Sequence, residues 1–257
     1  MNVLDLFKLD GKTAIVTGGG RGLGAQMAEA FAEAGANVVV CSRKLEACEE
    51  VSKELREKGV RSIAFQCDVT NPTEVQDVVD GTLEEFGSID ILVNNSGATW
   101  GAPAVEMPLE AWNKVMNVNV TGTFLMSQAV GREMIKQQSG KIINIASVAG
   151  LGGADPRVMD TIGYNASKGA VITFTKDLAT KWGQYNINVN AIAPGFFPTK
   201  MSQGLLDQGS KLILEGTPLN RFGSDYDLKG AALFLASNAS NFVTGDILIV
   251  DGGSHAM

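Results

Sequence analysis

The sequence predicts an α/β fold: a single-domain, doubly wound parallel sheet with helices on both faces. Short runs rich in β-branched residues alternate with longer helical segments over the whole chain, which is the pattern of strands joined by right-handed helical crossovers. Several of these runs are apolar on both faces, as strands buried within a parallel sheet are. We find no internal repeat, low-complexity tract or Pro/Ser-rich linker, so residues 1–257 are expected to form one Rossmann-like domain.

Seven segments are predicted as strands, because each is short, β-branched and followed by turn-forming residues. In chain order they are Thr13–Thr17, Asn37–Cys41, Arg61–Gln66, Ile89–Asn94, Lys141–Ala146, Asn186–Ala193 and Asp246–Val250. In a doubly wound sheet, ligands bind at the carboxyl ends of the strands where the strand order reverses. Functional residues are therefore expected just after these segments.

Five segments are predicted as helices: Gly24–Ala34, Leu45–Lys58, Pro72–Glu85, Leu109–Ile135 and Tyr164–Trp182. The first carries its apolar residues on one stripe and stops at Gly35, and the second stops at Gly59. The third follows Asn71, a suitable N-cap, and has Pro72 in its first turn. The fourth is so long that we expect breaks within it.

Charge and composition exclude several classes of protein. The formal net charge is −7 and the pI is near 4.8, which disfavours binding to a nucleic-acid backbone. No apolar run is long enough to span a bilayer, and residues 1–10 mix charges among apolar side chains, unlike a signal peptide. We expect a cytoplasmic protein that binds neither nucleic acid nor membrane.

Cysteine and histidine are scarce. The three cysteines, Cys41, Cys48 and Cys67, do not suggest a disulfide framework. His255 is the only histidine, so a histidine-based zinc site has too few ligands, and a Ser-His-Asp hydrolase would depend on this one residue. No metal site is predicted.

A glycine-rich turn joins the first predicted strand to the first predicted helix. Glycines permit positive φ and remove Cβ atoms where a pyrophosphate approaches the backbone, and a helix N-terminus attracts the anion. The turn therefore predicts a dinucleotide site, although an ordinary tight turn would have a similar sequence. The candidate cofactor residues here are Thr17, Gly18, Arg21, Gly22, Leu23 and Gly24.

The second strand is followed by Ser42 and Arg43 rather than by a carboxylate. A carboxylate would hold the ribose 2′-hydroxyl of NAD, whereas a hydroxyl and a guanidinium attract the 2′-phosphate of NADP. Arg21 could add a second positive charge. We predict NADP(H) as the cofactor; the alternative is that Arg43 is a solvated charge at a helix start.

The ends of the third and fourth strands offer further cofactor contacts. Asp68 and Val69 could bond the edge of an adenine ring and pack on its face. Asn95, Ser96 and Gly97 would place amide and turn-forming groups beside the cofactor. Both groups are also common in ordinary turns, and their spacing does not decide between the two interpretations.

Tyr164 and Lys168 lie four residues apart in a predicted helix, so they share one face, one turn apart. An ammonium beside a phenol favours the phenolate and lowers the tyrosine pKa from its usual value of ~10. The phenol could then exchange a proton near neutral pH. Beside a dinucleotide, this pair would help to move a hydride to or from a carbonyl carbon.

The order and spacing of these motifs resemble those of the short-chain dehydrogenases/reductases. The resemblance runs from about Asp10 to Gly253 and covers Thr17-Gly18-x-x-x-Gly22-x-Gly24, Asn94-Asn95-x-Gly97, Asn119, Ser147, Tyr164-x-x-x-Lys168 and Pro194-Gly195. It implies a catalytic tetrad made of Asn119, Ser147, Tyr164 and Lys168.

The resemblance also implies a role for each member of the tetrad. Tyr164 would donate the proton to the carbonyl oxygen during reduction, and Ser147 would hydrogen-bond the same oxygen. Lys168 would bind the nicotinamide ribose and lower the tyrosine pKa. Asn119 would hold a water that links the lysine to solvent. The implied contacts at the nicotinamide end are Pro194, Gly195, Phe197 and Thr199.

Substrate specificity is expected from residues 150–161, a longer loop than the family usually has, and from residues 196–206. The second segment is apolar and contains glycine, which is typical of a lid that excludes water when it closes. The aromatic side chains could line a pocket or merely pack the lid. The candidate substrate contacts are Trp100, Phe196 and Phe197, with Ser147 and Tyr164.

Two substrate classes stay open. The chain is similar in layout to bacterial 3-oxoacyl-[acyl-carrier-protein] reductases of fatty acid biosynthesis, which implies reduction of a 3-oxoacyl thioester on acyl carrier protein or CoA. Arg132 would then contact the acidic carrier. The Ser42-Arg43 pair and residues 194–201 are similar instead to gluconate 5-dehydrogenases, which implies a keto-sugar acid. The apolar lid favours the thioester.

A protein that binds NADP without catalysis is the alternative from another class, and the complete tetrad disfavours it. The family is usually tetrameric, and the small and apolar residues of Leu109–Ile135 and Tyr164–Trp182 suit burial against a second copy. We expect a homotetramer with a small-molecule or carrier-bound substrate.

Overall fold

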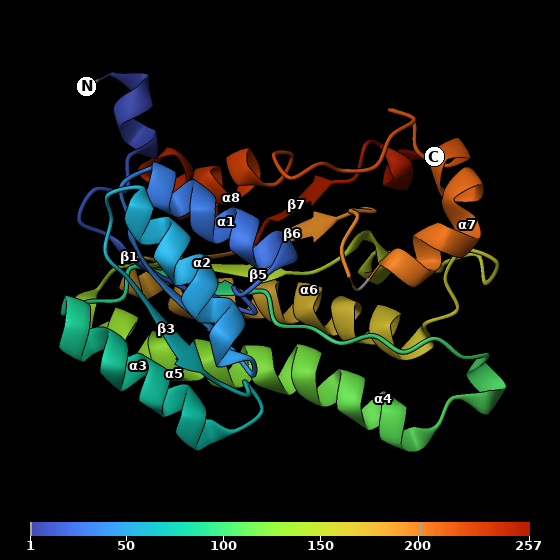
Figure 1. The fold of residues 1–257 in the computed structure, drawn as a ribbon, viewed down its shortest axis with the longest axis horizontal. Helices are drawn as coiled ribbons and strands as arrows, with labels where there is room; N and C mark the ends of the chain where they lie inside the picture. Colours follow the sequence, from blue (N-terminus) through green and yellow to red (C-terminus); the bar gives the residue numbers. More distant parts are fainter. Residues whose placement is uncertain (1, 201) are drawn as a thin grey trace.

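Parallel strands form one seven-stranded sheet, in the order β3-β2-β1-β4-β5-β6-β7, in the computed structural model of this protein (Figure 1). The structure describes residues 2–200 and 202–257, with the backbone alone for residues 203–208. The order reverses between β1 and β4, so ligands are expected at the carboxyl ends of these two strands. The strands are β1 (Thr13–Thr17), β2 (Asn37–Ser42), β3 (Ser62–Gln66), β4 (Ile91–Asn94), β5 (Gly140–Ile145), β6 (Ile187–Pro194) and β7 (Ile247–Val250).

Helices connect the strands and cover both faces of the sheet (Figure 1). The α-helices in the described part of the chain are α1 (Gly22–Glu33), α2 (Leu45–Glu57), α3 (Pro72–Phe86), α4 (Leu109–Met116), α5 (Gly122–Gln137), α6 (Ile162–Trp182), α7 (Gln203–Glu215) and α8 (Lys229–Ala236). Four short turns matter below: η1 (Val3–Phe7), the π turn η3 (Asn117–Thr121), η4 (Val148–Gly150) and η6 (Asn238–Ser240).

Two apolar cores lie on the two faces of the sheet. On one face, α1, α2 and α8 pack on strand residues such as Ala14 and Val16. On the other, α3, α5 and α6 pack on strand residues such as Ile15. Successive strand residues point to opposite faces, and both faces are covered, which is why the strands carry apolar side chains on both faces.

The predicted fold class is confirmed, and each of the seven predicted strands is present, with its ends displaced by at most two residues. The helices α1 and α6 each begin two residues earlier than predicted, at Gly22 and Ile162. The long helix predicted over Leu109–Ile135 is broken, as expected, into α4 and α5 by the π turn η3.

Two helices go beyond the sequence-based prediction. The first, α7, begins near the end of the segment 196–206 that we expected to form a lid and includes only its residues 203–206; Met201 of that segment lies outside the described residues. The second, α8, is short and almost entirely apolar. A short apolar run does not show whether its period is that of a helix or of a buried strand.

Within residues 2–200 and 202–257, no helix is both long and apolar enough to cross a membrane. The same residues contain no cluster of three or more His, Cys, Asp or Glu side chains that could hold a metal ion.

Candidate active site

The glycine-rich turn leaves the N-terminus of α1 open to a ligand. Gly18 and Gly22 have φ values of +64° and +54°, a left-handed conformation that favours glycine. Arg21 is the N-cap of this 12-residue helix, and its side chain makes no capping hydrogen bond. The first N–H groups of the helix therefore have no side-chain cap, and such a helix end attracts an anion.

Thr17 and Asn95 hold this turn against the end of β4. The Asn95 amide donates to the carbonyl oxygens of Thr17 at 2.9 Å and Gly18 at 3.2 Å. Thr17 Oγ1 accepts the N–H groups of Asn95 and Ser96, each at 3.0 Å. Both side chains thus bond within the protein, so they shape the turn for a ligand that would contact its backbone.

Gly24→Ala is expected to lower the melting temperature and to weaken binding of NADPH. A Cβ at Gly24 would lie 2.4 Å from the carbonyl oxygen of Gly18 and 2.5 Å from Asn95 Nδ2, so the turn must open to admit it. Gly230→Ala in α8 is the matched control, because no atom lies within 4 Å of its Cβ position and alanine favours a helix by about 1 kcal/mol. Calorimetry and fluorescence titration with NADPH compare the two. Equal behaviour of both variants would contradict the role given to Gly24.

Positive charge is present near the end of β2, but the Ser42 hydroxyl is less available to a ligand than predicted. Ser42 Oγ donates to the Lys44 carbonyl oxygen at 3.1 Å and accepts from the Lys44 N–H at 3.2 Å and from Cys48 Sγ at 3.1 Å. Arg21 and Arg43 are exposed and form no ion pair with any described residue. The two guanidiniums are therefore free to bind an anion.

Asp68 at the end of β3 stays ionised beside this positive charge. Its Oδ1 accepts hydrogen bonds from the Thr70 N–H at 2.9 Å and the Thr70 hydroxyl at 2.7 Å. Burial raises the pKa of the carboxyl, but the bonds from Thr70 and the charge of Arg43 outweigh it, and the net pKa is below the usual value. The Val69 side chain is buried in the core against Gly122. Of Asp68 and Val69, it is thus Asp68 whose polar side chain could contact a ligand.

Ser147, Tyr164 and Lys168 converge at the carboxyl end of β5. Ser147 directly precedes η4 and its side chain hydrogen-bonds the Tyr164 phenol. Lys168 Nζ donates to the carbonyl oxygen of Ile145 at 2.6 Å and lies 5.6 Å from the centroid of the Tyr164 ring. A Cβ at Gly150 would lie only 2.6 Å from the Lys168 carbonyl carbon. Glycine at this position therefore lets η4 approach α6 closely enough to bring the three side chains together.

Burial controls the protonation of this group. It raises the pKa of the Tyr164 phenol, and the hydrogen bond with Ser147 offsets part of the rise. It lowers the pKa of Lys168 to about 8. Lys168 is not among the causes of this shift, because its amine is directed to the Ile145 carbonyl. A tyrosine pKa lowered by Lys168 stays a prediction for the protein with its cofactor bound. Lys168 itself can exchange a proton near neutral pH.

Asn119 lies in the π turn η3, a conformation that is frequent at functional sites. Its Oδ1 accepts from the Ala98 N–H at 2.7 Å, and its Nδ2 donates to the Ala98 carbonyl at 2.9 Å and to Ser167 Oγ at 2.8 Å. Ser167 Oγ in turn donates to the Tyr164 carbonyl at 2.7 Å. Both amide hydrogens of Asn119 are thus engaged, and the residue ties the loop after β4 to α6. The Asn119 Oδ1 atom can still accept a hydrogen bond from water, but neither hydrogen on Nδ2 is free to be donated.

Of the residues expected at the nicotinamide end, Thr199 faces the glycine-rich turn, since its Cγ2 lies 3.7 Å from the Cβ position of Gly22. Gly195 donates its N–H to the Val250 carbonyl at 3.0 Å, and a Cβ there would lie 2.8 Å from Asp251 Cα. Gly195 therefore allows the ends of β6 and β7 to pack together, and the next residues turn back toward the cofactor turn.

The structure separates the predicted substrate residues. Trp100 is 46% exposed in the loop after β4, and a bridge between Ala102 and Thr161 places this loop beside the segment that precedes α6. Phe197 is only 6% exposed and belongs to the core, where its ring fills the space beside Gly223. Phe197 is therefore a packing residue, and Trp100 remains available at the mouth of the site.

Phe196 and Arg132 lie apart from Tyr164 and Lys168. Phe196 lines a small pocket between β7 and the segment after α7, with Leu219 and Asp251 among its other walls. Arg132 is exposed on α5 and donates to Gln128 Oε1 at 3.2 Å. It lies roughly 20 Å along the helical path from Asn119, so the structure does not bring it to the site.

The structure adds two groups that the sequence analysis missed. Ser167 lies inside the Tyr164–Lys168 motif, and its place on the helix face next to Tyr164 could have identified it. The carbonyl of Ile145, which accepts from Lys168, carries no sequence signal because it is a backbone group.

Comparison with known proteins agrees with this geometry. A family model described as "short chain dehydrogenase" matches residues 12–209. The 5-keto-D-gluconate 5-reductase of Escherichia coli (strain K12) is 38% identical over 251 residues, which cover 97% of either chain. A 3-oxoacyl-[acyl-carrier-protein] reductase of Chlamydia trachomatis is 42% identical over 243 residues, 94% of this chain and 96% of the relative. The crystal structure of a gluconate 5-dehydrogenase from Burkholderia cenocepacia, in complex with NADP and tartrate, has a TM-score of 0.94 at 39% identity and covers 100% of both chains.

Proposed function

From the premise that this chain belongs to the short-chain dehydrogenase/reductase family, we propose that it is an NADPH-dependent reductase of a keto-sugar acid. Membership in the family makes it an NAD(P)-dependent oxidoreductase that acts on a carbonyl or an alcohol. The preference for NADP and the identity of the substrate are the parts that we propose.

The observation that carries the proposal is the convergence of Ser147, Tyr164 and Lys168 at the end of β5. Because β5 neighbours β4, and β4 neighbours β1, this group lies on the same edge of the sheet as the open N-terminus of α1. A dinucleotide held by α1 would thus lie on the edge of the sheet that carries the proton-transfer group.

The residues present fit such a cofactor, which supplies a hydride from its nicotinamide ring when bound. The N–H groups at the start of α1 would hold the pyrophosphate, and Arg43 and Arg21 would bind a 2′-phosphate. Ser147 would hold the carbonyl oxygen of the substrate, and the half-buried Tyr164 phenol would give it a proton. The raised phenol pKa keeps Tyr164 protonated until the oxygen becomes basic.

Two considerations favour a keto-sugar acid over a thioester. Phe197, one of the aromatic residues expected to line an acyl pocket, is buried in the core. Relatives named for gluconate or ketogluconate chemistry match over nearly the whole chain.

Reduction of a 3-oxoacyl thioester is the second candidate. Apolar side chains are exposed on the segments that flank the site: Trp100 at 46%, Leu151 at 43% and Ile162 at 45%. These could accept an acyl chain, and the reductase of this type from Chlamydia trachomatis is 42% identical.

Initial rates of NADPH oxidation with 5-ketogluconate and with acetoacetyl-CoA test the choice directly. We expect turnover with the sugar acid and little with the thioester. The reverse result would overturn the proposed substrate in favour of the second candidate, and activity with neither would remove both substrates while leaving the family assignment in place.

Arg43→Ala is expected to reduce the preference for NADPH over NADH by about ten- to a hundredfold, since a hydrogen bond to a charged group contributes about 1.5–3 kcal/mol. Dissociation constants for both nucleotides are measured by fluorescence titration. Lys53→Ala, an exposed lysine on α2, is the control for loss of charge. An unchanged preference in Arg43→Ala would mean that Arg43 is only a solvated charge.

We also propose a homotetramer. Phe124 on α5 is 44% exposed and Ile162 on α6 is 45% exposed, and large apolar side chains on helix surfaces suit burial against a second copy. Light scattering coupled to size-exclusion chromatography measures the assembly; a monomeric mass would contradict it.

A further inference from the structure

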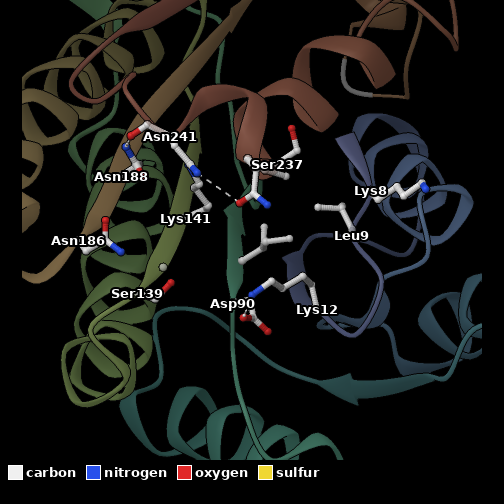
Figure 2. Close-up of a pocket in the computed structure, with 14 residues that line it drawn as sticks. Lys8, Leu9, Lys12, Asp90, Ser139, Lys141, Asn186, Asn188, Ser237 and Asn241 are labelled. Atoms are coloured by element: carbon white, nitrogen blue, oxygen red, sulfur yellow. Dashed lines mark hydrogen bonds and ion pairs between the residues drawn. The ribbon is translucent and has the colours of Figure 1, made fainter. Parts of the chain in front are cut away.

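A polar cavity lies at the amino ends of β4, β5 and β6, at the edge of the sheet opposite the candidate active site (Figure 2). Its volume is about 160 Å³. A water molecule needs about 10–15 Å³ of such space, so the cavity has room for a small ion with its waters, and it is smaller than the roughly 300–1,000 Å³ of most small-molecule sites. The walls come from five places in the chain: the residues around η1, the start of β4, the start of β5, the start of β6, and η6 with the residues around it.

One lysine in this cavity has no counter-charge. Lys12 pairs with Asp90 at 2.9 Å, and Lys8 pairs with Asp5 at 2.7 Å and points away from the cavity in Figure 2. Lys141 forms no ion pair with any described residue, and the one side chain within hydrogen-bond distance is Ser240, whose Oγ lies 3.4 Å from its Nζ. Asp90 is the only acidic residue that lines the cavity, so Lys141 leaves a positive charge unbalanced there.

The position of Lys141 in β5 makes this charge unexpected. Successive strand residues alternate between faces, so Lys141 shares its face with Ile143 and Ile145, which both lie in the core beneath α8. An apolar side chain would suit this position. Burial instead lowers the pKa of Lys141 to about 8, which means that the charged ammonium destabilises the folded state at this position.

We propose that this cavity binds a small oxyanion of the size and charge of inorganic phosphate, with the Lys141 ammonium as its counter-charge. An anion in the cavity would restore the missing charge balance, and Lys12 Nζ, which has three hydrogens and gives one to Asp90, could donate a second bond. The charged groups that face the anion are then Lys141, Lys12 and Asp90. This site is independent of the proposed function, because it lies at the other edge of the sheet.

The proposal predicts how binding depends on pH. The anion needs a protonated Lys141, so its affinity should fall as the pH rises through about 8. Without the anion, the stability of the fold should change with pH in the opposite direction to the binding affinity. Because the folded-state pKa of Lys141 is below the usual 10.5, the unfolded chain binds more protons between these values, and stability should rise with pH over that window.

The test is a titration of the protein with potassium phosphate at pH 7, with potassium chloride at the same ionic strength as the control. The readouts are the melting temperature and the heat of binding measured by calorimetry. Four proteins are compared: the unmodified chain, Lys141→Met, Arg43→Ala and Lys136→Met. Arg43→Ala removes an anion-binding group at the cofactor end, and Lys136→Met removes an exposed lysine of α5 that pairs with Glu133. Lys141→Gln is the second variant at the site, should the methionine variant fail to fold.

We expect a saturable, phosphate-specific stabilisation in the unmodified chain, Arg43→Ala and Lys136→Met, and an affinity at least about tenfold weaker in Lys141→Met and Lys141→Gln. In chloride, Lys141→Met should be at least as stable as the unmodified chain at pH 7. Undiminished phosphate binding in the Lys141 variants would overturn the proposal. So would a loss confined to Arg43→Ala, which would place phosphate at the cofactor end, or the absence of any phosphate-specific effect in the unmodified chain.

Discussion

Tyr164→Phe is expected to lower the rate of carbonyl reduction by about 10²–10⁴-fold, the range that a positioned proton donor contributes, while NADPH binds as before. The change removes one oxygen atom. Tyr164 is one turn from Lys168 and hydrogen-bonded to Ser147, and the phenylalanine ring fills the same space, so the fold and the cofactor turn should be unaffected. Steady-state rates and a fluorescence titration with NADPH separate the two effects.

Tyr226→Phe is the control for this change, because Tyr226 is 76% exposed and far along the chain from the motif. If Tyr164→Phe retained full turnover, the proton would come from another group. If neither protein reduced any carbonyl and both bound NADPH equally, the chain would fit the non-catalytic NADP-binding class instead.

Lys168→Met should also lower turnover strongly and should remove an inflection from the pH profile. Burial gives Lys168 a pKa of about 8, and kcat/KM reports the groups that titrate in the free enzyme. If the protonated amine supports reduction, kcat/KM for reduction should fall as the pH rises through about 8 in the unmodified protein. The methionine variant should show no such fall.

Stability gives a second and independent readout for Lys168. Its folded-state pKa lies below the usual 10.5, so the charged amine destabilises the fold at pH values below about 8, and stability should rise between about 8 and 10.5. The contribution of Lys168 to this rise in stability should be absent in Lys168→Met. Lys176→Met, an exposed lysine two turns further along α6, should keep both the inflection and the rise; identical profiles for the two variants would contradict the account.

The sequence was sufficient to predict the fold class because the signals are local. Each strand is a short apolar run that ends in a turn, and the alternation with helices admits few topologies. The strand ends are less predictable because they depend on pairing. Ile89 is fully buried, yet it lies before β4, because its N–H and carbonyl bond the Gln137 side chain rather than a neighbouring strand.

The candidate site was predictable where spacing along one element decides the geometry. The Tyr164–Lys168 spacing correctly indicated one helix face, and the glycines correctly indicated a turn that needs positive φ. The direction of a side chain among competing partners was not predictable. Lys168 bonds the Ile145 carbonyl, and the Phe197 side chain is buried in the core, because contacts distant in sequence decide both.

Lys141 shows a signal that sequence analysis could have used. It opens a mostly apolar run, Lys141–Ala146, in which the spacing alone predicts it only as the first residue of a strand. Period-two alternation already places it on the face of Ile143 and Ile145, but only the structure shows that a cavity lies there.

The most direct test of the central claim is hydride transfer itself. The protein is supplied with NADPH that carries deuterium at the transferred position of the nicotinamide ring, together with a ketone that it reduces, and the alcohol is analysed by mass spectrometry and NMR. The account predicts one deuterium on the new carbinol carbon and, in Tyr164→Phe, very slow formation of the same labelled product. An alcohol without deuterium, or NADPH oxidation without reduction of any carbonyl, would contradict it.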